Sequence, residues 1–308
     1  MRLKIVSCVL TVIMLASPVA VVAQSTTSPL VVLTDLERAL YGQEQPGALL
    51  ARVEAVELDI FGTAQTGPVM TRIDRIHEFL AGDLKGSGLK LQLNLVEWGF
   101  LEQLTANEPL IRRLERIEVE FIGGPQSGPV VERVEQLMLY IWGTTKLDTA
   151  PVKVPMETLV EIQILTTVDS AVNKVGDLVK YQVASDLVVD GRIVIPRGSQ
   201  GVGKITEVVK AGGLGKSGRV VIDFGSVGAF DGKNIRLQVA EKALERNSRL
   251  ELAAGASMAG VLLLGGPIGL VGGYFIKGED VKIEAGSKFF VETDIEYQTR
   301  GFRLVPAN

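Results

Sequence analysis

Short blocks of sequence recur at fixed intervals in the first half of the chain, and this repeat constrains the fold more than any other feature. Arg52 returns as Arg72, and this pair of arginines returns at the same spacing as Arg113 and Arg133. Repeats with such periods are typical of small supersecondary units that stack on their neighbours. The repeat therefore predicts an array rather than one irregular domain.

Each repeat unit has the pattern of a short amphipathic helix followed by a loop. The loops at 62–67 and 123–128 begin and end with glycine, which suits the left-handed residue that closes a helix. One such helix cannot bury its apolar stripe alone, so we expect an array of helical hairpins over residues 24–147. Apolar residues recur at the helical spacing of three and four, as at Leu49, Val53, Val56 and Ile60.

Charged residues lie between the apolar positions of these helices. Charge runs on helices are usually solvated, with pairs worth roughly 0.2–0.5 kcal/mol each. We therefore expect a solvated face of mixed ion pairs, and the alternative is a docking surface. The residues concerned are Arg52, Glu54, Glu57, Arg72, Asp74, Arg75, Arg113, Glu115, Arg116, Glu118, Arg133 and Glu135.

The recurring Arg-Val-Glu and Phe-Gly elements carry a resemblance to a known repeat. Between Leu36 and Gly143 they resemble a helical repeat of about 20 residues found in exported bacterial proteins. The resemblance implies location in the cell envelope and a scaffolding role. It implies no biochemical activity.

The first residues have the three-part pattern of a secretory signal. Arg2 and Lys4 precede an apolar run over 5–20, short side chains follow at 21–23, and Gln24 begins a polar stretch. We expect residues 1–23 to be a cleaved signal peptide, and the alternative is an uncleaved membrane anchor. The chain is then exported to the periplasm or the outer membrane.

The composition of the expected mature chain excludes several function classes. Its single cysteine, Cys8, leaves with the signal, so neither a disulfide nor a thiolate metal site remains. Loss of Arg2 and Lys4 takes the net charge from −4 to −6, which offers nucleic acid no basic surface. One histidine, His77, is too few for a zinc site, and no Gly-x-Ser-x-Gly motif accompanies it. We expect a surface histidine, no cofactor, no nucleic-acid partner and no enzymatic activity.

The apolar pattern changes after residue 143, where the period becomes two. Alternation between glycine-rich turns is typical of antiparallel strands, and eight short strands favour a barrel or sandwich. We expect a linker around Pro151 and Pro155, and the predicted fold class is α+β. Within residues 148–308 the expected strands lie near 159–168, 178–184, 188–195, 201–209, 219–227, 234–240, 280–284 and 288–296.

Residues 213–218 match the string G-x-G-x-x-G, and Gly215-Lys216-Ser217 looks like the end of a phosphate loop. Both motifs need a helix after them, because its N-terminal N–H groups bind the phosphate. Residues 219–227 alternate as a strand instead. We therefore expect a hairpin loop and no nucleotide cofactor.

Three motifs follow one another in the second half: Ile195-Pro196-Arg197-Gly198-Ser199, then Gly218-Arg219 before an apolar strand, then Asp231-Gly232. Over residues 175–240 this order resembles the β-barrel domain of outer-membrane channel subunits of type IV, conjugation-type, secretion systems. The resemblance implies a β-barrel and, as one function, a secretion channel. The proline-rich linker and cytoplasmic anchor of that family have no counterpart here, so a shared fold with another function stays open.

Residues 252–276 carry no charge at any position. Pro267 divides this apolar insert into halves, each too short to cross a membrane alone as a helix. Small residues four apart let helices approach closely, and terminal aromatic residues suit a membrane interface. We expect a glycine-rich helical hairpin that contacts lipid or another subunit; the alternatives are a plug in the barrel and disorder. The contact residues are Ala256, Gly260, Gly265, Gly266, Pro267, Gly269, Gly273, Tyr274 and Phe275.

Two functions from different classes fit these features. The leading hypothesis is a non-enzymatic envelope scaffold or interaction protein, anchored or oligomerised through the apolar insert. Its partners are then outer-membrane lipid, other envelope proteins or further copies of the chain. The second hypothesis is a subunit of an outer-membrane channel or secretion complex, which a closed oligomeric ring would favour. An enzyme is a distant third.

Overall fold

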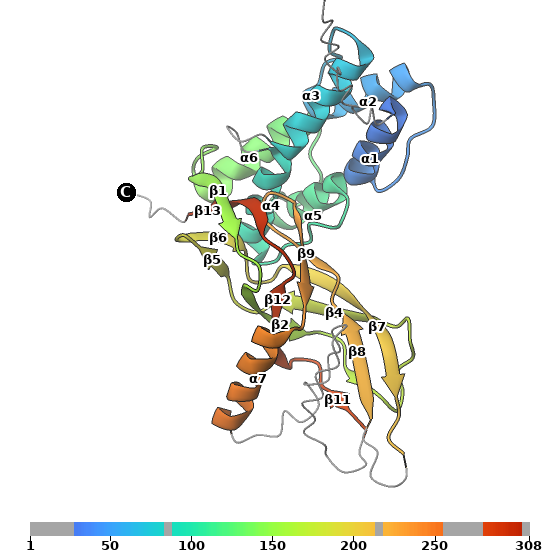
Figure 1. Cartoon of the computed structure of the whole chain (residues 1–308). Coiled ribbons are helices and arrows are strands. Elements are labelled where there is room, and N and C mark those ends of the chain that lie inside the picture. The colour runs from blue at the N-terminus through green and yellow to red at the C-terminus, as the bar shows by residue number, and fades with distance from the viewer. Residues whose placement is uncertain (1–27, 83–87, 213–217, 255–279, 304–308) are drawn as a thin grey trace, which may run out of the picture.

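The computed structural model describes residues 28–82, 88–212, 218–254 and 280–303. Over these ranges the fold is α+β, as the sequence predicts: six helices precede the first strand, and an antiparallel β-module follows (Figure 1). The helices of the array are α1 (Pro29–Tyr41), α2 (Leu49–Phe61), α3 (Val69–Ala81), α4 (Leu89–Leu101), α5 (Leu110–Ile122) and α6 (Val130–Trp142).

The six helices share one length and an almost constant spacing, which confirms the repeat. Each has 13 residues, and they begin at positions 29, 49, 69, 89, 110 and 130. The interval is thus one residue longer between α4 and α5 than elsewhere. Glycines in the left-handed region end four of them, at Gly42, Gly62, Gly123 and Gly143. Other side chains are strained in this conformation, so glycine determines where these helices stop.

Two contacts of the same kind hold α1–α3 against α4–α6. Gly42 at the end of α1 lies against Pro109 before α5, and Gly62 at the end of α2 lies against Pro129 before α6. A Cβ added to these glycines would come within 2.8 Å and 2.6 Å of the proline rings. The contact recurs one repeat later, so the two triplets of helices pack in register. The core between them includes Leu33, Leu40, Val53, Val56, Ile60, Ile73, Ile76, Leu80, Leu114 and Ile117.

The β-module contains a closed barrel. Strands pair in the order β4-β2-β12-β10-β9-β7, and β7 pairs back with β4, while β8 adds to the edge of β7. A second sheet has the order β1-β13-β6-β5, and β3 pairs with β11. Closure removes the free edges that would otherwise pair with other chains. The bounds are β1 (Thr149–Val154), β2 (Leu159–Ile164), β3 (Val168–Asp169), β4 (Leu178–Val183), β5 (Leu187–Val189), β6 (Arg192–Ile195), β7 (Gln200–Val209), β8 (Arg219–Asp223), β9 (Ser226–Gly228), β10 (Asn234–Gln238), β11 (Lys282–Ile283), β12 (Lys288–Thr293) and β13 (Tyr297–Phe302).

Aromatic side chains fill the interior of the barrel. The rings of Tyr181 and Phe224 lie 5.5 Å apart, and those of Phe224 and Phe289 lie 5.6 Å apart. The Tyr181 hydroxyl donates to the carbonyl oxygen of Phe224 at 2.8 Å, and burial raises its pKa. Gly201 leaves room for this ring, because an added Cβ would overlap it. A barrel this narrow is packed by its own side chains.

Three elements differ from those that the sequence predicts. The expected linker around Pro151 is strand β1, which pairs with β13 along its whole length. Proline is tolerated there because β1 is an edge strand. Residues 219–227 form two strands, since Gly225 adopts a φ of +61° between them. Helix α7 (Glu241–Ala254) follows β10 where the sequence predicts no element.

Candidate functional site

The contact residues predicted in the apolar insert lie outside the described residues, as does the predicted signal peptide. The described element that leads into the insert is α7, so its attachment is the part of this site that the structure defines. The nine residues concerned are Ala256, Gly260, Gly265, Gly266, Pro267, Gly269, Gly273, Tyr274 and Phe275.

Polar contacts with β12 fix α7 to the barrel. The carboxylate of Glu292 accepts a hydrogen bond from the backbone N–H of Ala243 in the first turn of the helix, at 2.7 Å. The side chain of Asn247 accepts from the backbone N–H of Phe290 at 2.8 Å and donates to its carbonyl at 3.0 Å. Desolvation of the buried Glu292 raises its pKa. These contacts hold α7 at the end of the β-module remote from the helical array (Figure 1).

A second group of charged side chains lies inside the helical array. A glutamate at the ninth position of one helix binds an arginine at the fourth position of the next. Glu57 Oε1 accepts from Arg72 Nε at 3.0 Å, and Oε2 accepts from Arg72 Nη2 at 2.6 Å and from the backbone N–H of Gln65 at 2.8 Å. Each such unit is termed a rung. The rungs are Glu37–Arg52, Glu57–Arg72, Glu97–Arg113 and Glu118–Arg133.

The rungs show that the expectation of a solvated charged face is wrong for these residues. Glu37, Glu57 and Glu97 are 0% exposed, and all four arginines are buried or nearly so. Desolvation opposes the ionised form of Glu57, yet the hydrogen bonds from Arg72 and Gln65 outweigh it and lower its pKa. The constant separation of 15 or 16 residues between partners is the signal that reveals the rungs, because a solvated pair needs no fixed interval.

The junction between α3 and α4 has no rung. The ninth residue of α3 is His77, and the fourth residue of α4 is Gln92. His77 is exposed, as the sequence predicts. The rungs therefore join helices within each triplet and skip the boundary between the triplets.

Glu97 connects the rungs to the β-module. Besides Arg113, it accepts hydrogen bonds from Arg116 Nη2 at 2.6 Å and from the backbone N–H of Thr105 at 3.0 Å. Arg113 also donates to Asn94 Oδ1 at 2.6 Å, and Asn94 Nδ2 donates to the carbonyl of Phe230 at 2.7 Å. A continuous path of hydrogen bonds thus runs from a buried carboxylate of the array to the β-module.

An aromatic cluster also joins the two regions. Trp98 of α4 stacks on Trp142 of α6 with ring centroids 6.3 Å apart. The edges of Phe230 and Phe302, both from the β-module, meet Trp98 at 5.4 Å and 6.5 Å. Gly99 allows this approach, because an added Cβ would come within 2.6 Å of the Trp142 ring. Such packed aromatic contacts contribute about 0.5–1.5 kcal/mol each beyond area burial, so the junction is a continuous core.

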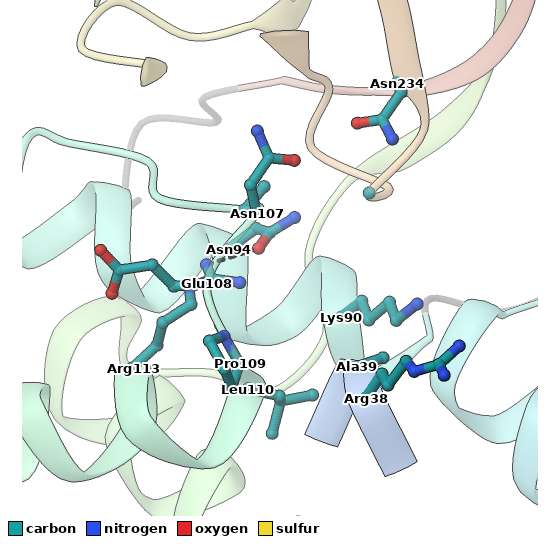
Figure 2. A pocket seen from close by; sticks show the side chains of 12 residues that line it. Arg38, Ala39, Lys90, Asn94, Asn107, Glu108, Pro109, Leu110, Arg113 and Asn234 are labelled. Carbon is teal, nitrogen blue, oxygen red and sulfur yellow. Dashed lines mark hydrogen bonds between the residues drawn. The ribbon is translucent and has the colours of Figure 1, made fainter. Parts of the chain in front are cut away.

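A pocket of about 320 Å³ lies beside this junction. Its wall combines α1, α4, the loop 105–109 and the turn that leads into β10 (Figure 2). Sequence reasoning missed this site, because its residues come from four separate segments. The polar side chains that line it are Arg38, Lys90, Asn94, Asn107, Glu108, Arg113 and Asn234.

Other site types are absent from the part of the chain that the structure describes. No helix there is long and apolar enough to cross a membrane. Nor is any group of three or more His, Cys, Asp or Glu side chains placed to hold a metal ion. Strand β8 begins directly after Gly218, so the glycine motif precedes a strand and not the helix that a phosphate site needs.

Comparison with known proteins yields one structural likeness to describe. No protein-family model and no curated protein sequence matches the chain. Among solved structures, the chain is similar to ComB10 of the Com type IV secretion system of Helicobacter pylori, at a TM-score of 0.27 and 18% sequence identity. That likeness covers 47% of this chain and 88% of the ComB10 chain. At this score it assigns no function.

Proposed function

We propose that the chain is a non-enzymatic scaffold or interaction protein of the bacterial envelope, anchored or oligomerised through its apolar insert. One observation carries this proposal: α7, fixed by Glu292 and Asn247, leads directly into the insert at 252–276, which carries no charge. Apolar surface of that length is unfavourable in water and needs an apolar partner.

The filled barrel supports a partner outside the β-module. Tyr181, Phe224 and Phe289 already occupy the interior, which disfavours the insert as a plug. The glycines at 265, 269 and 273 favour close approach of a second helix. Tyr274 and Phe275 favour the headgroup region of a bilayer.

The rungs and the aromatic cluster support a scaffolding role. Each buried glutamate of a rung is bound by an arginine and by a backbone N–H, as in the pairs Glu37–Arg52 and Glu118–Arg133. Carboxylates held ionised in this way are poor general acids, and they face the core of the array. The non-enzymatic assignment follows from this use of the buried charges.

A second candidate is a subunit of an outer-membrane channel or secretion complex. The sequence resemblance of residues 175–240 to type IV channel subunits favours it. Oligomeric state discriminates the two candidates: a large closed ring in mild detergent supports the channel, and a monomer or dimer supports the scaffold.

Deletion of residues 255–276 tests the proposal. The deleted protein should move from the membrane fraction to the soluble periplasmic fraction and keep the far-UV circular dichroism of the β-module, because a longer or shorter loop changes closure entropy only slightly. N-terminal sequencing of the same material should start near Gln24.

Substitution within the insert provides the finer test. Gly269→Leu should leave the protein in the membrane but dissociate its oligomers, because a bulky side chain blocks helix approach. Val271→Leu, off the glycine face, should change neither property. An unfolded or insoluble deletion protein would mean that the insert is core packing, and wild-type protein found in the soluble fraction would rule out membrane contact.

A further inference from the structure

We infer that the pocket beside the junction of α4 and β10 binds a small anion through a carboxylate or phosphate group. This site is independent of the membrane contact proposed above. The inference rests on one partly buried lysine without a carboxylate partner, in a pocket whose other charges are largely neutralised.

Lys90 supplies the unneutralised charge. It lies on α4, and its aliphatic stem packs against the turn before β10: a Cβ added to Gly232 would lie 3.5 Å from Lys90 Cδ. Burial lowers the pKa of Lys90, and no neighbouring carboxylate counteracts this effect. Among the described residues it has no ion-pair partner. An anion in the pocket would restore the charge balance that the wall lacks.

The remaining charged groups of the pocket are already engaged, with one exception. Arg113 is bound by Glu97 and Asn94 inside the array. Glu108 pairs with Arg116 at 2.7 Å, so it does not neutralise Lys90.

Arg38 is the exception. Its only ion pair is with Asp35 at 3.5 Å, and both side chains are more than 60% exposed. Surface pairs of this kind are weak, so Arg38 is free to turn toward a bound anion. The pocket therefore has a positive excess made by Lys90 and Arg38.

Two amides complete the chemistry of the site. Asn107 and Asn234 line the pocket from the loop 105–109 and from β10 (Figure 2), and each amide group offers N–H donors to an oxyanion. The loop is held in place, because a Cβ added to Gly228 would come within 2.7 Å of Ala106 Cβ. Ammonium, guanidinium and amide donors around one small cavity are the groups that recognise carboxylate or phosphate. The volume of about 320 Å³ restricts the ligand to a small molecule.

The experiment is an NMR titration of isotope-labelled protein with inorganic phosphate and with succinate, against sodium chloride at equal ionic strength. Wild type should show saturable shifts of the Asn107 and Asn234 side-chain amide signals. Lys90→Met keeps the aliphatic stem and should weaken binding about tenfold or more, because a charge-assisted contact is lost. Lys204→Met, an exposed lysine on β7, should bind like wild type.

Two results would overturn the inference. One is the absence of saturable shifts with both probes up to about 10 mM, an affinity too weak for a built site. The other is unchanged affinity in folded Lys90→Met. If Lys90→Met fails to fold, Asn234→Asp replaces it, since Asn234 is exposed and an added carboxylate should repel the anion and abolish the shifts. Unaltered binding in Asn234→Asp would equally contradict the site.

Discussion

The helical array and the β-module meet the same packing requirement with opposite chemistry. The array buries four carboxylate–guanidinium rungs between its helices, whereas the barrel interior is filled by rings such as Tyr181, Phe224 and Phe289. Short helices with similar apolar stripes can slide past one another, and a bidentate ion pair fixes their register. Strands of a closed barrel have their register fixed by backbone hydrogen bonds and need no such device. The difference teaches that periodic charge in a helical repeat is an internal fastening.

The largest expected effect comes from breaking one rung. Glu57→Ala leaves Arg72 buried without its carboxylate and should lower the free energy of unfolding by about 3–5 kcal/mol. His77→Ala is the matched control, because His77 holds the same ninth position in the next helix but is exposed and forms no rung. It should change stability by less than about 0.5 kcal/mol. Urea unfolding measures both, and equal effects would remove the distinction between rung and surface.

The corresponding change in the barrel should have a smaller effect. Gly201→Ala places a methyl group against the Tyr181 ring, and overpacking of this kind costs about 1–3 kcal/mol. Gly124→Ala, in a loop of the array with no atom within 4 Å of the added Cβ, is the control and should leave the melting temperature unchanged or slightly higher. A tolerated Gly201→Ala would mean that the barrel interior is not tightly packed.

The two regions should respond to pH with opposite signs. The folded array lowers the pKa of Glu57 and Glu97, so the stability from these groups is present above the ordinary glutamate pKa of about 4.3 and is lost as pH falls through the folded values. Burial raises the pKa of Glu292, so its contribution is greatest at low pH and declines as pH rises through the folded value. Hydrogen exchange corrected for intrinsic rates should show the array loosening first below about pH 4, with the α7–β12 contact protected. Simultaneous loosening would refute the contrast.

The local features of the fold are predictable from the sequence, and the distant ones are not. Glycine spacing and apolar period predict the helices and most strands, because both are set within a few residues. Strand β1 escaped prediction because its partner is remote: Thr149 lies opposite Phe302. The burial of Arg72 and Glu57 was missed because residue type alone favours solvent. The pocket unites Arg38, Lys90 and Asn234, which only the tertiary fold brings together.

The scaffold account requires the array and the β-module to keep one fixed orientation. The chain from Gln24 onward contains no cysteine, so His77→Cys on α3 and Lys204→Cys on β7 can each be spin-labelled specifically; both positions are exposed. Electron–electron double resonance on this pair measures the distance distribution directly. The account predicts one narrow peak, which Trp98→Ala should broaden by removing the centre of the aromatic cluster. A broad or two-peaked distribution in the otherwise unaltered protein would contradict it.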